Sequence, residues 1–322
     1  MRILTVTFNP AIDQTVTLDR LVPGEVHRAR SVRQNAGGKG VNVASCLADW
    51  GEDVSAYGLL GSDNAASFDA LFAAKGIEDR FIRIAGTTRV NLKLVDPTGT
   101  TDINLDGIAV DPGRAEMVAA TICNAAREGD LVVLAGSLPP GCPPDTYAAL
   151  TARLRAIGCR VVLDTSGLPM KCALESAQPP HVVKPNRDEL SQLLARPLPD
   201  MVALLEAART LRDGGVALVV VSMGADGALF VSNEGALTAR LAIGEVASTV
   251  GAGDAMVAGI TAALAEEASL ERTARLATAF AVAKLGMAGP NLPALASVHA
   301  LAEEVIVTPI ETAATTAAGE TR

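Results

Sequence analysis

Aromatic residues are scarce in this sequence: only 3% of its 322 residues are Phe, Trp or Tyr, although 49% are hydrophobic. Ala, Val and Leu must therefore build the core, a composition that is typical of parallel α/β proteins. Cysteine is sparse as well, and the five cysteines are scattered without a Cys-x-x-Cys pair. This pattern offers no metal site and favours small buried thiols in the reducing cytoplasm.

Positive charge and long apolar runs are also lacking. The net charge is −9, which argues against a general nucleic-acid or anionic-membrane binder. Gly, Pro or charged residues interrupt every apolar run before it reaches membrane-spanning length. The three histidines are dispersed, so neither a zinc centre nor a Ser/His/Asp triad is predicted. The N-terminus has the pattern of a strand and not of a signal peptide, and we expect a cytoplasmic protein.

Strand-like and helix-like segments alternate along the chain. The strand-like runs are Arg2–Phe8, Asp53–Leu60, Leu131–Ala135, Arg160–Asp164, Val182–Lys184 and Ala217–Ser222, and the helix-like ones include Val41–Trp50, Ala65–Lys75, Pro143–Ile157 and Met201–Arg212. This order predicts an α/β fold with a mostly parallel sheet and helices on both faces. We expect one domain over residues 1–310. The low-complexity residues 311–322 are expected to be a disordered tail.

Two segments, about 14–34 and 88–107, break this rhythm. Their alternating polar and apolar residues predict strands with one solvated face, outside the main sheet. Such strands would form a small β lid over the carboxyl ends of the parallel strands, where α/β sheets usually bind ligands. Exposed edge strands are best covered by a second copy of the chain, so we expect a homodimer through the lid.

A small-residue loop, Thr249–Gly253, ends in a carboxylate, Asp254, and runs straight into an apolar helical pattern. Such a junction presents backbone N–H groups and the positive end of a helix dipole to an anion. Asp254 could be the helix N-cap. It could instead remove a proton from a nucleophile that attacks a phosphoryl group. The segment alone leaves both interpretations open.

A second glycine loop, Ala36–Gly40, carries Lys39 directly before a helical pattern. Its glycines let backbone N–H groups approach a ligand, and the lysine adds a point charge that suits phosphate. The loop lacks the spacing of a Walker A motif. It follows a basic stretch in which Arg20, Arg28, Arg30 and Arg33 stand against the single acid Glu25. This stretch fits an anionic small molecule or a solvated strand face.

Three polar groups follow other strands. Asp13 closes the first strand, where it could bind sugar hydroxyls or form a local Asx turn. Asn186 and Glu189 lie three residues apart on one face of a helical turn. They could hold water bound to Mg²⁺ or form a capping box. The segment Val221–Leu229 has the pattern of a strand, a glycine turn and a second strand, which could line a nucleotide.

Together these motifs resemble the ribokinase superfamily, and within it the phosphofructokinase-B branch. The resemblance extends from Asn9 to about Gly289, with the motifs in family order. It is carried by Gly37–Ala44, Gly136–Pro139, Lys184–Leu190 and Ser248–Asp254. The segments Asn9–Asp13 and Thr88–Lys93, with the lysine of the glycine loop, are most similar to the 1-phosphofructokinase group. The loop 286–292, expected near the adenine, departs from the Pro-Gly-Thr type of this branch.

The resemblance implies a ribokinase-like three-layer sandwich and transfer of a phosphoryl group from ATP, with Mg²⁺, to a sugar phosphate. Fructose 1-phosphate is the expected acceptor, and tagatose 6-phosphate and fructose 6-phosphate are the alternative acceptors. A non-catalytic sugar-phosphate sensor is the alternative function. Asp254 is implied as the general base, with the N–H groups of Gly251, Ala252 and Gly253 as an anion hole. The implied substrate-binding residues are Asp13, Arg28, Gly38, Lys39, Asn42, Arg89 and Ser137. The implied nucleotide-binding residues are Lys184, Ser222, Gly224, Gly227 and Gly253, and Asn186 and Glu189 are implied to hold Mg²⁺ through water.

Overall fold

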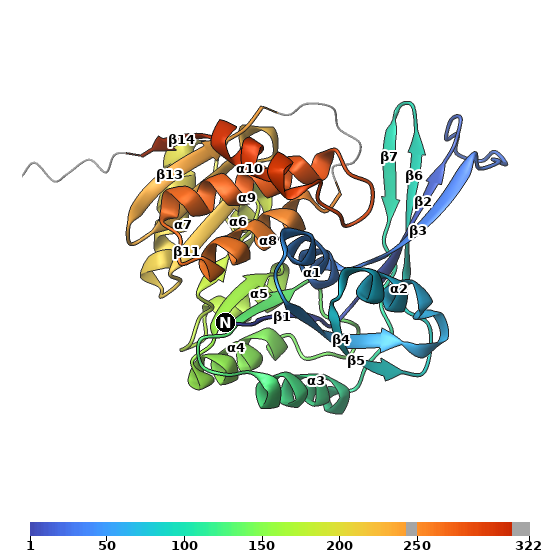
Figure 1. Cartoon of the computed structure of the whole chain (residues 1–322), viewed down its shortest axis with the longest axis horizontal. Coiled ribbons are helices and arrows are strands. Elements are labelled where there is room, and N and C mark those ends of the chain that lie inside the picture. Colours follow the sequence, from blue (N-terminus) through green and yellow to red (C-terminus); the bar gives the residue numbers. More distant parts are fainter. Residues whose placement is uncertain (243–249, 311–322) are drawn as a thin grey trace, which may run out of the picture.

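The apolar β-branched runs form a ten-stranded sheet in the computed structural model, which describes residues 1–242 and 250–310 (Figure 1). Seven neighbouring strands are parallel, in the order β11-β10-β9-β8-β1-β4-β5: Leu218–Ser222, Val182–Val183, Arg160–Asp164, Leu131–Ala135, Ile3–Thr7, Val54–Gly61 and Glu78–Ile84. Three antiparallel strands extend the β11 edge: β12 (Ala228–Ser232), β13 (Gly235–Arg240) and β14 (Ile306–Pro309). The expectation of a mostly parallel sheet is confirmed.

Helices cover both faces of this sheet. One face carries α1 (Lys39–Trp50), α2 (Ala66–Lys75), α8 (Ala252–Ala265), α9 (Leu270–Leu285) and α10 (Leu295–Glu304). The other carries α3 (Pro112–Ala125), α4 (Thr146–Ile157), α5 (Gly167–Leu174), α6 (Arg187–Leu193) and α7 (Met201–Asp213). In β8, Leu131 and Val133 pack on the first face while Val132 and Leu134 pack on the second. This period of two confirms the three-layer sandwich.

Helix α8 lies deep in the first layer and packs closely against α9. A β-carbon on Gly259 would lie 2.8 Å from the Cα of Ala277 and 2.9 Å from the carbonyl oxygen of Leu276. Because these are backbone atoms, only glycine allows the two helices to come this close. The buried position of α8 fixes where its N-terminus, and therefore the Asp254 loop, meets the ends of the strands.

The boundaries found in the structure are close to those expected from the pattern. Two strands, Leu131–Ala135 and Arg160–Asp164, have the expected bounds, whereas the helix expected from Pro143 begins at Thr146. Residues 311–322, expected to be a disordered tail, lie outside the described residues. Within the part that is described, no helix is long and apolar enough to cross a membrane.

The expected lid is a separate four-stranded sheet that protrudes from the body (Figure 1). Its order is β3-β2-β6-β7: Ser31–Gly37, Ala11–Thr17, Val90–Asp96 and Gly99–Ile103. The strands extend beyond the expected limits, since β2 begins before residue 14 and β3 ends after residue 34. Ala11, Ile12 and Ala36 at these ends are buried. The start of β2 and the end of β3 are therefore buried in the core. The sequence there lacks the alternation of polar and apolar residues that indicates the rest of these strands.

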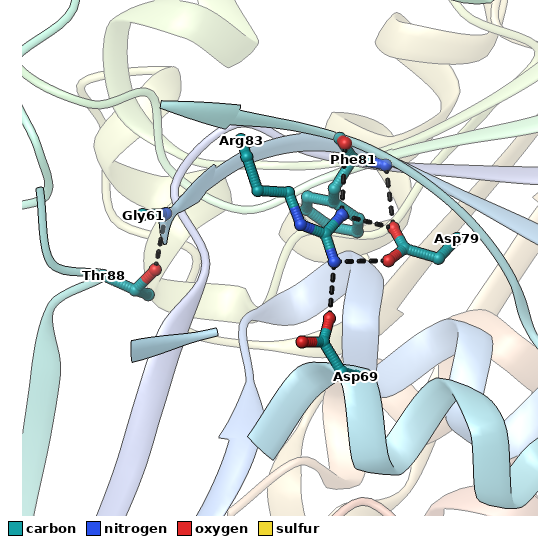
Figure 2. Close-up of polar contacts among 6 residues, drawn as sticks. All are labelled: Gly61, Asp69, Asp79, Phe81, Arg83 and Thr88. Atoms are coloured by element: carbon teal, nitrogen blue, oxygen red, sulfur yellow. Dashed lines mark hydrogen bonds and ion pairs between the residues drawn. The ribbon is translucent and has the colours of Figure 1, made fainter. Parts of the chain in front are cut away.

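Thr88 connects the base of the lid to the edge of the main sheet. Its hydroxyl accepts a hydrogen bond of 2.9 Å from the N–H of Gly61, the last residue of β4 (Figure 2). The N–H and carbonyl of Thr88 bond the side-chain amide of Asn64. Figure 2 also shows Arg83 of β5 donating to Asp79 and to Asp69 of α2. These contacts fix the point at which β6 leaves the body.

Candidate active site

The glycine loop before α8 leads directly into the N-terminus of this helix. Helix α8 begins at Ala252, and its N-cap is Gly251, with a φ of 83° that favours glycine. The first N–H groups of a helix have no acceptor within the helix, so they face outward. Asp254 lies at the third helical position and not at the N-cap, so the interpretation of Asp254 as the N-cap is wrong. Ser248 and Thr249 of the motif lie outside the described residues.

The carboxylate of Asp254 is buried and held in one orientation. Only 8% of the residue is exposed, and its Oδ2 accepts a 2.7 Å hydrogen bond from the side-chain amide of Asn42 on α1. Burial raises the pKa of Asp254, with Asp164 adding to the rise, while Lys39, Asn42 and Lys184 oppose it. A carboxylate whose pKa is raised in this way has the properties of a proton acceptor.

Two cavities lie on either side of Asp254. The first, which we call the lid cavity, has a volume of about 520 Å³ and is lined by lid residues such as Asp13, Arg89 and Lys93. The second, the β11 cavity, has a volume of about 590 Å³ and is lined by Lys184, Ser222 and Gly224, among others. The two cavities share Lys39, Glu189, Gly251 and Asp254 as lining residues. A group could therefore pass from a molecule in one cavity to a molecule in the other at Asp254.

In the lid cavity one acid, Asp13, pairs with one base, Lys93, and Arg89 lines the same cavity. The Oδ2 of Asp13 lies 3.2 Å from the Nζ of Lys93. A β-carbon on Gly37 would come within 2.7 Å of the same oxygen, so glycine leaves room for this carboxylate. The guanidinium of Arg89 donates to the carbonyls of Leu105 and Asn9, at 2.8 and 3.0 Å. These contacts hold Arg89 at the base of the lid, where it faces the cavity.

A buried carboxylate, Asp164, connects the two lysines at the junction of the cavities. Its Oδ2 lies 3.2 Å from the Nζ of Lys39, and its Oδ1 lies 3.5 Å from the Nζ of Lys184. Among the described residues, neither oxygen has a hydrogen-bond partner of normal geometry, so these contacts are mainly electrostatic. Burial lowers the pKa of Lys39, but Asp164, Asp254 and Glu189 outweigh it and hold the pKa above its ordinary value.

Sequence reasoning missed Asp164, although a signal was present. Asp164 closes the apolar strand β9 at its carboxyl end. The sequence pattern assigned this position to Asp13 on the first strand, but Asp13 lies within the lid strand β2 instead. The lid cavity contains further residues that were not among the expected site residues: Asn9, Asn91, Lys93, Asp102, Asn104, Thr165 and Ser166. Of these, Asn91 and Lys93 alternate with Leu92 and Leu94 on β6, and this period of two could have assigned them to one face.

Asn186 and Glu189 form the capping box that the sequence left as one of two interpretations. The Oδ1 of Asn186 accepts from the N–H of Glu189, and the Oε2 of Glu189 accepts from the N–H of Asn186, both at 2.8 Å. The box begins α6, and Glu189 lines both cavities. Capping therefore places the Glu189 carboxylate at the junction of the cavities. It does not exclude the other interpretation, in which Asn186 and Glu189 hold Mg²⁺ through water.

Most of the expected site residues gather around the two cavities. The lid cavity is lined by Asp13, Gly38, Lys39, Asn42, Arg89, Ser137, Gly251 and Asp254, and the β11 cavity by Lys184, Asn186, Glu189, Ser222, Gly224 and Gly253. Among the described lining residues of the two cavities, Arg28, Gly227 and Ala252 are absent. Arg28 is exposed on the lid. Gly227 lies in the turn before β12, where a β-carbon would come within 2.1 Å of the carbonyl of Ala239.

The loop 286–292 lies away from the β11 cavity, as far as the described lining residues show. Gly289 and Pro290 line a small pocket of about 60 Å³, together with Asp13 and Asn42. The carbonyl of Pro290 accepts a hydrogen bond from the hydroxyl of Ser45 on α1. This loop therefore borders the lid side of the site, although the sequence led us to expect it near an adenine.

Known proteins with the same pattern are carbohydrate kinases. The pattern of the pfkB family carbohydrate kinases matches residues 6–296. The chain is 53% identical over 290 residues to a 1-phosphofructokinase of Xanthomonas campestris, covering 88% of this chain and 91% of the relative. It is 48% identical over 310 residues to a 1-phosphofructokinase of Rhodobacter capsulatus, covering 95% and 98%.

Solved structures agree with these relatives. Phosphofructokinase-2 from Escherichia coli, in complex with fructose-6-phosphate, matches with a TM-score of 0.86 and 28% identity over 94% of this chain and 98% of that one. The tetrameric inhibited form of the same enzyme matches with a TM-score of 0.87, 28% identity and the same coverage. The family pattern spans nearly the whole chain, and the junction of two cavities at a buried carboxylate suits phosphoryl transfer. The chain belongs to the pfkB family of carbohydrate kinases.

Proposed function

We propose that this kinase transfers the γ-phosphoryl group of ATP to a hydroxyl group of fructose 1-phosphate, forming fructose 1,6-bisphosphate and ADP. The observation that carries the proposal is the junction at Asp254, where a lid cavity with basic side chains meets a second cavity beside a helix N-terminus. The chemistry of the lid cavity supports an anionic acceptor, and the curated relatives are 1-phosphofructokinases. The acceptor occupies the lid cavity and ATP the β11 cavity.

In this mechanism Asp254 takes the proton from the acceptor hydroxyl as that oxygen attacks the phosphoryl group. The N–H groups of Gly251, Ala252 and Gly253 stabilise the charge on the transferred group. Lys39, at the junction, balances negative charge on both substrates. Phosphoryl transfer depends mainly on positioning and charge neutralisation, and this site provides both.

The donor set at the junction fits Mg²⁺ carried by a nucleotide. Magnesium on ATP is usually held by one or two carboxylates, several waters and the phosphates. Glu189 and the two buried oxygens of Asp164, which lack normal hydrogen-bond partners among the described residues, are donors of this kind. The capping bond engages Oε2 of Glu189 and leaves the carboxylate a second oxygen for water. Glu189 and Asn186 would hold the ion through water, and bound Mg²⁺ would supply charge neutralisation.

A location in the cytoplasm is part of the same proposal. The five cysteines are free thiols, two of them buried. Free thiols are stable in a reducing compartment, where sugar phosphates and ATP also occur.

A panel of acceptors tests the proposed function. With MgATP, we expect fructose 1-phosphate to give the highest kcat/KM, because the basic side chains of the lid cavity suit a phosphorylated sugar. Tagatose 6-phosphate, fructose 6-phosphate and unphosphorylated fructose complete the panel, and ADP release is the measurement. A higher kcat/KM for either 6-phosphate would show that this sugar, and not fructose 1-phosphate, is the preferred acceptor. Binding of the sugar phosphates without ADP release would favour the non-catalytic sensor.

Replacement of the base provides a second test. Asp254→Asn keeps the size and the contact with Asn42 but removes the proton acceptor. A general base contributes about 10²- to 10⁴-fold, so we expect kcat to fall by at least that range. The affinity for ATP, measured by calorimetry, should remain almost unchanged. Full turnover by this variant would show that Asp254 is not the base.

The pH profile should reveal the environment of Asp254. Its carboxylate must be deprotonated to act, and burial raises its pKa. The acid limb of kcat/KM should therefore lie above the ordinary aspartate pKa of about 3.9. Lys39 lowers the pKa of Asp254, so Lys39→Met should move the limb to higher pH. The exposed Lys171, which pairs with Glu175, supplies the control Lys171→Met. A limb that moves to lower pH in Lys39→Met would contradict this assignment.

We further propose that the chain forms a homodimer through the lid. The lid exposes large apolar side chains at Val26, Val32, Ile103 and Leu105, and β3 and β7 are its edge strands. Covering such edges with a second copy removes unpaired backbone groups from solvent. Arg28, exposed on the same lid, would then face the partner subunit and could reach its acceptor.

Sedimentation tests the dimer. Val32→Lys places a charge on the β3 edge and should shift the protein toward monomer. The control is Val202→Lys on α7, an equally apolar exposed position away from the lid. Unchanged association in Val32→Lys, or a wild-type protein that is monomeric at all working concentrations, would contradict the lid interface.

A further inference from the structure

Lys93 is a partly buried base that the proposed mechanism does not use. It lies on β6, where it is opposite Thr15 of β2 and Asp102 of β7 in the sheet register. Its Nζ is 3.2 Å from the Oδ2 of Asp13, and the side chains of Lys93 and Asp13 are only 13% and 19% exposed. Asn91, one step along the same face, donates to the other oxygen of Asp13 at 3.5 Å. The pair is therefore held by the sheet and points into the lid cavity.

In the proposed function, the phosphate of the acceptor lies at one end of the lid cavity and its reacting hydroxyl lies at the other. The pair of Asp13 and Lys93 is separate from the cations at these two ends, Arg89 and Lys39. Arg89, Asn9 and Ser137 line both the lid cavity and an outer cavity of about 390 Å³, and the guanidinium of Arg89 suits the phosphate of the acceptor. Lys39 and Asp254 mark the reacting end. Asp13 and Lys93 instead line the small pocket beside Asn42. A sugar bound with its phosphate near Arg89 and its reacting hydroxyl near Asp254 would present its remaining hydroxyl groups to this pair.

A second buried ammonium in the same small pocket is already engaged. Lys284 is 3% exposed, and its Nζ donates to the carbonyl of Met287 at 2.9 Å. This contact links α9 to the loop 286–292 and directs the charge of Lys284 toward the backbone. Among the described residues of the small pocket, Lys93 is the ammonium that also lines the lid cavity.

We propose that Asp13 and Lys93 act as an acceptor–donor pair that recognises two neighbouring hydroxyl groups of the acceptor sugar, which makes Lys93 a specificity-determining residue. A carboxylate only accepts hydrogen bonds and an ammonium only donates them. Two neighbouring hydroxyls can satisfy both when their configuration matches the spacing of the pair. An epimer turns one hydroxyl away, so a partly buried charged group loses its hydrogen bond to that hydroxyl, which is costly.

This inference rests on the proposed sugar-phosphate kinase activity and makes a distinct claim about it. If Lys93 served only as a counter-ion for Asp13, its loss would weaken every sugar phosphate alike. If it recognises a hydroxyl, its loss must reduce the discrimination between epimers. The ratio of kcat/KM values between epimers therefore separates recognition from a general electrostatic or structural role.

The experiment compares wild type with Lys93→Met on fructose 1-phosphate and on its C3 and C4 epimers, psicose 1-phosphate and tagatose 1-phosphate. We expect KM for fructose 1-phosphate to rise about tenfold or more, in line with the loss of a charged hydrogen bond, while kcat changes far less. The preference over at least one epimer should fall by about the same factor. Lys93→Arg keeps the charge in a different shape and should recover part of the affinity.

Lys75→Met is the matched control. Lys75 is also 13% exposed and pairs with an aspartate, Asp49, at 2.7 Å, but it is outside the lining of the lid cavity among the described residues. It should leave the epimer preference unchanged even if it lowers the melting temperature. If Lys93→Met does not fold, by near-ultraviolet circular dichroism, Lys93→Gln takes its place, because it keeps a neutral donor.

Two results would overturn the inference: equal losses on all three sugars with the preference kept, or no loss at all. The proposal of fructose 1-phosphate as the acceptor is tested separately, and it is contradicted when the wild type prefers a 6-phosphate sugar. In that case the preference is measured between that sugar and its epimers, and the same two results would overturn the inference about Lys93. A wild type that phosphorylates no sugar phosphate overturns both proposals.

Discussion

The site depends on holding one carboxylate, Asp254, in a fixed orientation inside the protein. Burying a charge is costly unless nearby groups compensate it. The amide of Asn42 and the N-terminus of α8 supply dipoles, and Lys39 and Lys184 supply opposite charge, with Asp164 between the two lysines. The result is a row of alternating charges in which each member makes the burial of its neighbours less costly. Lys39 and Asp254 of this row line both cavities, so they lie where the two substrates of the proposed reaction would meet.

Close backbone packing makes this row possible. Gly259 lets α8 approach α9, and Gly37 leaves room for the carboxylate of Asp13. Gly251 takes up the left-handed conformation that turns the chain into α8. A side chain at Gly259 would push α8 away from α9, and one at Gly37 would crowd the carboxylate of Asp13. The small residues that dominate the composition are therefore as much a part of the active site as its charged groups.

The lid contributes polar groups to a site whose walls are otherwise the ends of parallel strands. Its inner face carries Asp13, Asn91 and Lys93, and Thr88 fixes its base to β4. A sugar has many hydroxyl groups, and a strand is suited to them because it sets alternate side chains about 7 Å apart on one face. In the proposed mechanism the body provides the groups for phosphoryl transfer, and the lid provides contacts to the acceptor.

Much of this protein was determined by the sequence alone. Alternating apolar runs predicted the parallel sheet, and glycine loops followed by helical patterns identified Lys39 and Asp254, because turn chemistry and periodicity are local properties of the chain. The contact of Asn42 with Asp254, the position of Asp164 between two lysines and the pairing of Lys93 with Asp13 were decided by the tertiary structure. These partners are far apart in the sequence, and their contact depends on sheet order and register, which no local pattern records. The same reason explains Arg28: its charge suggested a ligand, but the lid directs it to the surface.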